Sequence, residues 1–138
     1  MSTKGSFSFP KREKLCSQKL IDALYAEGHR LTVYPYSVRW RLCPDGLLPE
    51  GVRVQALIAT SKKKFHHAVD RNRVKRLSRE CYRHAKPSLT TFLASRGLSL
   101  TLALNYIHND IFPYAVLSAK MEKVVQSLTN EIVRHAGE

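Results

Sequence analysis

The chain is poor in acidic residues. It has 11 Asp and Glu among 138 residues, against 23 Lys and Arg, which gives a formal net charge of +12. The acids stand singly along the sequence, whereas a metal-dependent protein nuclease needs grouped carboxylates to hold two divalent ions about 4 Å apart. Neither a Ser-His-Asp arrangement nor a phosphate-binding glycine loop is found. We therefore expect no catalytic residue in the protein, and no metal or other cofactor bound by the protein itself.

Cysteine and long hydrophobic runs are also scarce. Cys16, Cys43 and Cys81 are far apart and form no Cys-x-x-Cys pair, which is typical of a reducing compartment. No apolar run approaches the roughly 18 residues of a membrane span. The first residues, MSTKGSFSFPKR, lack the hydrophobic centre of a signal peptide. We expect a cytoplasmic protein without a membrane partner.

Positive charge is concentrated between residues 60 and 83. This segment, TSKKKFHHAVDRNRVKRLSRECYR, holds nine of the 23 Lys and Arg residues and two of the 11 acids. Charge of one sign at such density repels itself, so it favours a polyanionic partner. Val74, Leu77 and Cys81 recur at helical spacing, as in a helix that packs on a core. The segment is therefore predicted to be a folded basic surface.

A helical projection at about 100° per residue separates the two sides of this helix. The apolar stripe contains Val74, Leu77, Cys81 and Ala85. The opposite side presents an outer row made of Asn72, Arg76, Arg79 and Arg83. At about 1.5 Å per residue the row spans roughly 16 Å, or several phosphate spacings of a nucleic acid. We predict that this row binds nucleic acid, with Lys75 and Arg71 on its shoulder and Arg73 at the core boundary.

The order of residues here also matches a known motif. Lys62-Lys63-Lys64 is followed by Ala68-Val69, by Arg71-Asn72-Arg73 and Lys75-Arg76, and then by Arg79-Glu80. This order resembles the signature of the protein subunit of bacterial ribonuclease P. The resemblance extends from about Phe9 to about Ile132.

The resemblance implies a role in RNA processing. In that family an RNA subunit carries the catalytic groups, and the holoenzyme requires Mg²⁺ and removes the 5′ leader of precursor tRNA. DNA is not an expected partner. The catalytic RNA would be bound by the basic helix and the loop before it, through Lys62, Lys63, Lys64, Arg71, Asn72, Arg73, Lys75, Arg76, Arg79 and Arg83.

The resemblance further implies a cleft, lined by aromatic residues, for the single-stranded leader. Matching by distance from Gly28 places Tyr25, Ile21 and Tyr36 near it, although family members often carry Phe where Ile21 stands. Stacking on an aromatic ring is worth about 1–3 kcal/mol per base. The expected cleft residues are Tyr25, Tyr36, Trp40 and Arg39, with packing in the core as the alternative for Trp40.

Hydrophobic periodicity gives a coarse secondary structure. It predicts helices over residues 11–27, 67–86 and 113–134, and strands over residues 31–42, 52–60 and 98–107. Ser17 could cap a shorter first helix, and residues 44–51 read as a hairpin loop. Pro87 is expected to end or bend its helix. Gly97 is expected to close a further turn of helix over residues 88–96. We expect one α+β domain, 1–138, with flexible ends at 1–8 and 136–138.

The resemblance implies a more detailed fold than the periodicity does. It implies an αβ sandwich with a mixed four-stranded sheet in the order α-β-β-β-α-β-α. Its β-α-β crossover would be left-handed, where general rules alone favour a right-handed one.

Two other nucleic-acid proteins are alternatives. A ribosomal or rRNA-assembly protein would have the same charge but would need only the basic helix, without a second site for a single strand. A DNA-binding helix module is disfavoured, because no turn and helix precede the basic helix.

Overall fold

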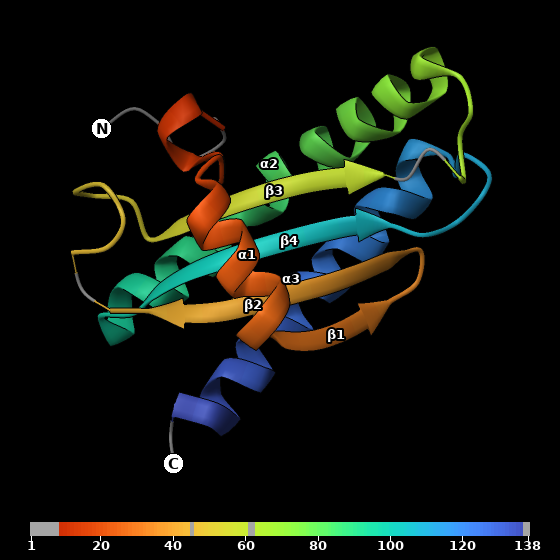
Figure 1. Ribbon diagram of the computed structural model, residues 1–138. Helices are drawn as coiled ribbons and strands as arrows, with labels where there is room; N and C mark the ends of the chain where they lie inside the picture. Colours follow the sequence, from red (N-terminus) through yellow and green to blue (C-terminus); the bar gives the residue numbers. More distant parts are fainter. Residues whose placement is uncertain (1–8, 45, 61–62, 137–138) are drawn as a thin grey trace.

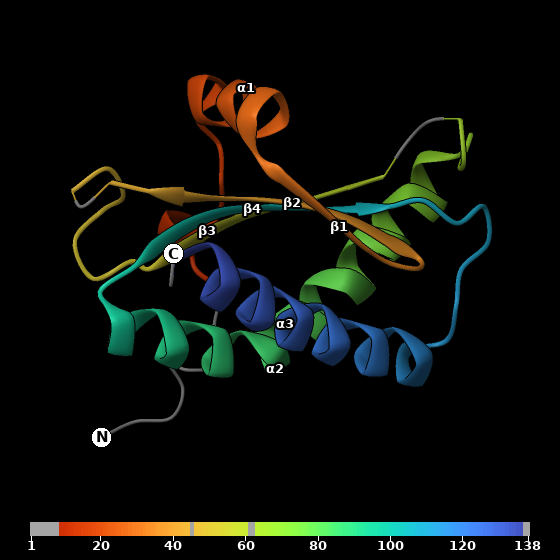
Figure 2. The ribbon, with the colours of Figure 1, turned by 90° about the horizontal axis from the view of Figure 1, so that it is seen from below.

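The structure, a computed structural model, describes residues 9–44, 46–60 and 63–136. Within that part of the chain a 4-stranded sheet has helices on both faces (Figures 1 and 2). The elements in chain order are the 3-10 turn η2 (Lys11–Glu13), α1 (Gln18–Glu27), β1 (His29–Val33), β2 (Tyr36–Cys43), β3 (Val54–Thr60), α2 (Ala68–Arg96), β4 (Ser99–Tyr106) and α3 (Tyr114–Ala136). Apart from η2, this is the expected order α-β-β-β-α-β-α of an α+β fold.

The strands lie in the order β1-β2-β4-β3. The pairs β1–β2 and β2–β4 are antiparallel, whereas β3 and β4 are parallel, so the sheet is mixed as expected. α2 connects the parallel pair and lies on the sheet face away from α1, which makes the crossover left-handed (Figures 1 and 2). Such connections are right-handed in about 98% of cases. The hand implied by the family resemblance is thus confirmed.

The larger core lies between the sheet and the layer of α2 and α3. Alternate residues of a strand face the same side, and the residues of β2 and β4 on this side pair directly across the sheet. They are Tyr36, Val38 and Trp40 in β2 and Leu100, Leu102, Leu104 and Tyr106 in β4. α3 contributes an apolar stripe made of Leu117, Met121, Val124, Val125, Leu128 and Ile132. This layer fixes the orientation of α2.

The other sheet face carries a smaller core under α1. Leu15, Leu24 and Ala103 are buried there, with partly buried neighbours that include Ile21. The expected helix over 11–27 is shorter in the structure, because Lys14 makes a β-bridge to Ala56 at the edge of β3. α1 starts after Ser17, whose Oγ accepts a hydrogen bond from the Leu20 amide at 3.3 Å. The capping role of Ser17 is confirmed.

Two boundary predictions are wrong. The strand over 31–42 is divided by the turn at Tyr34-Pro35, and Val33 pairs with Tyr36 across it. The loop at 44–51 is no hairpin, because β4 lies between β2 and β3. Residues at the expected flexible ends lie outside the described ones, except Ala136, which ends α3.

Pro87 neither ends α2 nor separates residues 88–96 from it, because the helix continues to Arg96. A proline inside a helix costs about 3 kcal/mol. Leu89 and Leu93 lie beyond it and are fully buried. Burial of such side chains contributes about 1.5–3 kcal/mol each, which offsets the proline. Gly97 ends the helix at φ 66, in the left-handed conformation expected of it.

Candidate nucleic-acid interface

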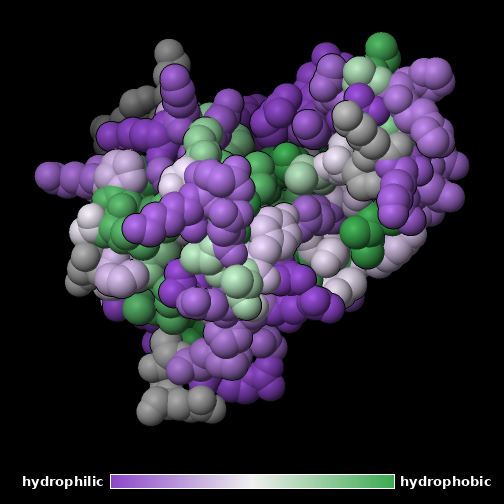
Figure 3. Space-filling model, viewed as in Figure 1, coloured by the Kyte–Doolittle hydropathy of each residue, from purple (hydrophilic) through white to green (hydrophobic). Residues whose placement is uncertain are grey.

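α2 presents its basic residues on the side opposite the core. Val74, Ser78 and Cys81 are buried, while Arg76 and Arg79 are exposed. Asn72 and Arg73 are exposed as well, and Arg71, Lys75 and Arg83 are half-buried. Figure 3 shows hydrophilic residues gathered over the start of α2. The orientation predicted from helical periodicity is therefore correct for the apolar stripe and for Arg76 and Arg79, whereas Arg73, expected at the core boundary, is exposed.

The cations of the helix differ in how far their charge is balanced. Arg83 forms an ion pair with Glu80, and His84 Nε2 lies 3.4 Å from the same carboxylate. The hydrogen bond from Arg83, together with its charge, lowers the pKa of Glu80. Within residues 63–136, by contrast, no ion pair is found for Arg76 or Arg79. The unbalanced charge of the outer row is therefore carried by these two arginines.

Arg71 has a structural role that its position in the motif did not reveal. Its Nη1 donates hydrogen bonds to the carbonyl oxygens of Phe65, at 2.8 Å, and His66, at 3.0 Å. These bonds fasten the loop after β3 to the first turn of α2. Lys63 and Lys64 are exposed on that loop, and Lys62 lies outside the described residues. Arg71 thus holds two of the predicted RNA-binding lysines next to the helix.

The assignment of Tyr36 and Trp40 to a leader cleft is wrong. Both side chains are 0% exposed and belong to the core under α2 and α3. The Tyr36 hydroxyl lies 2.7 Å from Ser78 Oγ, and burial raises the pKa of this phenol. His29 stacks on Trp40 with ring centroids 4.4 Å apart. Neither ring can therefore receive a nucleotide base.

Tyr25 and Arg39 do come together, on the sheet face that carries α1. The Arg39 guanidinium lies 5.4 Å from the centre of the Tyr25 ring, and its Nη1 donates to the Tyr25 carbonyl oxygen at 2.8 Å. The Tyr25 hydroxyl donates to Asn105 Oδ1 at 2.9 Å. We call these three residues the Tyr25 cluster. Asn105 is not among the predicted cleft residues. Ile21, which is part of α1, packs against the small core that contains Leu24.

Tyr36→Phe separates a role in the core from a role in binding. The variant keeps the ring but removes the buried hydrogen bond to Ser78. We expect a loss of about 1–2 kcal/mol in the free energy of unfolding, measured by urea denaturation. The ratio of affinities for precursor and mature tRNA should stay unchanged in the assembled enzyme. A change in that ratio without a loss of stability would contradict the placement in the core.

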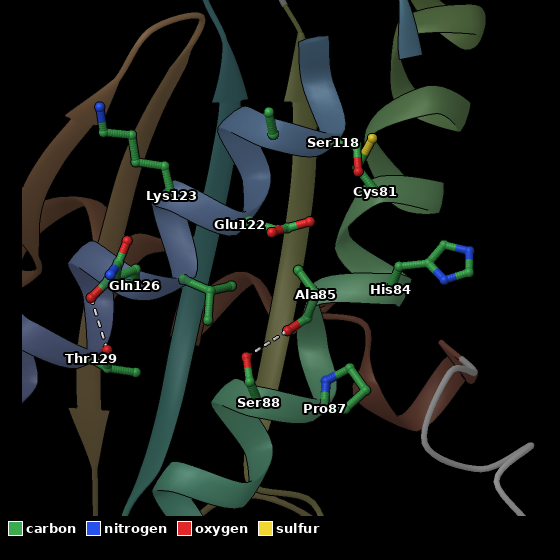
Figure 4. A pocket seen from close by; sticks show the side chains of 12 residues that line it. Cys81, His84, Ala85, Pro87, Ser88, Ser118, Glu122, Lys123, Gln126 and Thr129 are labelled. Atoms are coloured by element: carbon green, nitrogen blue, oxygen red, sulfur yellow. Dashed lines mark hydrogen bonds between the residues drawn. The ribbon is translucent and has the colours of Figure 1, made fainter. Parts of the chain in front are cut away.

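A groove lies between α2 and α3 (Figure 4), and both helices lie on the sheet face opposite α1 (Figure 2). It has a volume of about 810 Å³ and includes Cys81, His84 and Glu122. Burial raises the pKa of Cys81 to about 11, so its thiol is a weak metal ligand near neutral pH.

Among residues 9–44, 46–60 and 63–136 no three His, Cys, Asp or Glu side chains form a group that could hold a metal ion. No helix in the same residues is long and apolar enough to cross a membrane.

Comparison with known proteins agrees with this geometry. A family model described as Ribonuclease P matches residues 9–128. The ribonuclease P protein component of Porphyromonas gingivalis is 32% identical over 123 residues, which cover 89% of this chain and 88% of that protein. The corresponding protein of Chlorobium phaeobacteroides is 35% identical over 105 residues, 72% of each chain.

Comparison of structures gives the same fold. The ribonuclease P protein of Staphylococcus aureus superimposes with a TM-score of 0.58 at 17% sequence identity, over 84% of this chain and 94% of that one. The matching fold, the basic motif on α2 and the relatives above 30% identity agree with one another. The chain therefore belongs to the family of ribonuclease P protein components, the protein part of an endoribonuclease that processes the 5′ end of tRNA.

Proposed function

We propose that this protein binds the catalytic RNA of ribonuclease P through α2 and holds the 5′ leader of precursor tRNA at the Tyr25 cluster. The outer row supports the first part most strongly. Arg76 and Arg79 are exposed and have no ion pair among the described residues, while the reverse side of the helix is core. Contacts to phosphates position a protein on RNA and relieve the repulsion within its own surface.

Catalysis and metal binding belong, in this proposal, to the RNA. The described carboxylates form no group that could hold a metal ion, so the Mg²⁺ that the holoenzyme needs would be held by RNA phosphates. The positive surface would lower the repulsion between the two RNAs and thereby favour both substrate and metal binding. We place this assembly in the cytoplasm.

The second part of the proposal concerns the sheet face beside α1. The Tyr25 side chain is 37% exposed, unlike those of Tyr36 and Trp40, so its ring is open to a ligand. Unpaired bases stack on aromatic rings largely irrespective of their identity. The adjacent Arg39 guanidinium supplies positive charge for the phosphate of a stacked nucleotide. A single-stranded leader satisfies both requirements, and the proposed cleft residues are now Tyr25, Arg39 and Asn105.

Tyr25→Ala tests the leader site directly. We expect the reconstituted holoenzyme to lose about 1–3 kcal/mol of binding free energy for precursor tRNA, which is the contribution of one stacked base. Mature tRNA lacks the leader and should bind as before. The measurement is the dissociation constant of both substrates under single-turnover conditions. Unchanged binding of precursor tRNA would refute the leader site and would favour a protein that only binds structured RNA.

A further inference from the structure

Tyr25 is exposed on the last turn of α1, yet other side chains hold its ring in place. Its hydroxyl donates to Asn105 Oδ1 at 2.9 Å, across 80 positions of sequence. The amide of Asn105 is engaged at both ends, because Nδ2 donates to the Ser37 carbonyl oxygen at 3.3 Å. Arg39 lies over the ring and is bonded to the Tyr25 backbone. The Tyr25 side chain is therefore held by both Asn105 and Arg39.

Asn105 is unusual within its strand. β4 is central in the sheet, and Asn105 is the one residue of the strand that is not buried. Its side chain points to the α1 face, because it pairs with Ser37 and alternates with the buried Leu104 and Tyr106. An apolar residue could fill this position without any need for a hydrogen-bonding partner. The polar amide of Asn105 thus stands where the Tyr25 hydroxyl contacts the sheet.

We propose that Asn105 is a positioning residue for leader recognition, an inference that rests on the leader site proposed above. By accepting the hydrogen bond from Tyr25, its side chain holds the ring in one orientation before the leader arrives. Ordering a free side chain on binding costs about 0.5–1.5 kcal/mol. Asn105 removes that cost for Tyr25. Loss of the bond should therefore weaken leader binding by roughly 2- to 10-fold.

The test uses Asn105→Ala, Tyr25→Phe and the double variant in the holoenzyme reconstituted with ribonuclease P RNA. Tyr25→Phe keeps the stacking ring and removes only an exposed hydroxyl, so it will fold. Each single variant should raise the dissociation constant of precursor tRNA by roughly 2- to 10-fold and leave mature tRNA unchanged. The double variant should be no weaker than either single one, because both changes remove the same bond.

Gln55→Ala is the matched control. Gln55 is also a polar strand residue on the α1 face, and its side chain donates to the Arg12 carbonyl oxygen at 2.8 Å, away from Tyr25. This variant should bind both substrates normally. Additive effects of Asn105→Ala and Tyr25→Phe, or an equal loss for precursor and mature tRNA, would overturn the positioning role.

Tyr25→Ala distinguishes the two proposals. If Tyr25→Ala weakens precursor binding while Asn105→Ala and Tyr25→Phe do not, the leader site stands and only the positioning role of Asn105 fails. If Tyr25→Ala has no effect either, the leader site itself fails.

Discussion

Replacement of both Arg76 and Arg79 by alanine is expected to weaken binding of ribonuclease P RNA by roughly a hundredfold at low salt. Hydrogen bonds to charged groups contribute about 1.5–3 kcal/mol each, so two lost phosphate contacts amount to about 3 kcal/mol. Each lost contact also removes about one unit from the slope of log K against log salt. The double variant should therefore flatten that slope by about two units, measured by binding titrations between 50 and 200 mM salt.

The fold should tolerate this change. Both side chains are exposed and lack an ion pair in the described part of the chain, and surface substitutions of this kind alter stability by about 0.5 kcal/mol or less. Arg96→Ala is the matched control. Arg96 is exposed on the same helix, about 25 Å further along, and lies over the ring of Phe92. Its loss should leave the salt slope nearly unchanged.

Arg83→Ala provides a second comparison. Arg83 already donates a hydrogen bond to Glu80, so fewer of its donors are left for a phosphate, and Arg83→Ala should reduce RNA affinity less than Arg76→Ala does. If the variant with both Arg76→Ala and Arg79→Ala keeps the RNA affinity, the salt slope and the melting curve of the unchanged protein, then the outer row is a solvated surface. The RNA contact must then lie elsewhere.

The basic helix could be predicted from the sequence because its signal is local. Apolar residues at helical spacing from Val74 to Ala85 determine which side packs on the core, and the arginines follow on the other side. Ion pairs with near neighbours, such as Glu80 with Arg83, are also local. The bond from Arg71 to the carbonyl of Phe65 was not predictable, since it depends on how the loop turns back.

The leader site was only partly predictable, because the turn before a strand decides which of its side chains point to which face of the sheet. Alternation correctly groups Tyr36, Val38 and Trp40 on one face, but it does not show which helix layer covers that face. Counting from Gly28 ignored the turn at Tyr34-Pro35, where β1 ends and β2 begins. The structure turns Arg39, not Tyr36, toward α1.

Asn105 was missed because its partner is far away in sequence. The one signal available was a polar residue that interrupts the apolar run LSLTLALNYI. Such an interruption indicates that the residue meets a polar group, but it does not identify Tyr25. Only the packing of α1 across β2 and β4 brings the two side chains together.

The contacts of the N-terminal segment were likewise not predictable, because their partners are far away in sequence. Lys86, with a side chain only 4% exposed, forms an ion pair with Glu13 in η2, 73 positions away. Phe9 packs edge-on against the buried Tyr82 at 5.2 Å between ring centroids. These contacts fasten the segment that leads into α1 onto the far half of α2. The position of α1, and with it that of Tyr25, depends on this attachment.

Lys86→Met should therefore destabilise the protein strongly. The variant keeps a long apolar side chain but leaves the Glu13 carboxylate, 18% exposed, without its cation. Breaking a buried pair from one side costs about 3–5 kcal/mol. Urea denaturation should show this loss as a lower midpoint with an unchanged slope. The loss includes any other contact of the Lys86 ammonium group, so the pair itself must be isolated by a double-mutant cycle.

Glu13→Gln combined with Lys86→Met completes that cycle. Removal of both charges should recover much of the stability, because no unpaired charge then remains in the site. The exposed pair of Glu27 and Arg41 is the control, and Arg41→Met should cost about 1 kcal/mol or less. If the double variant is as unstable as the sum of the single ones, Lys86 acts independently of Glu13. The attachment of the N-terminal segment would then rest on Phe9 and Tyr82 instead of on the ion pair.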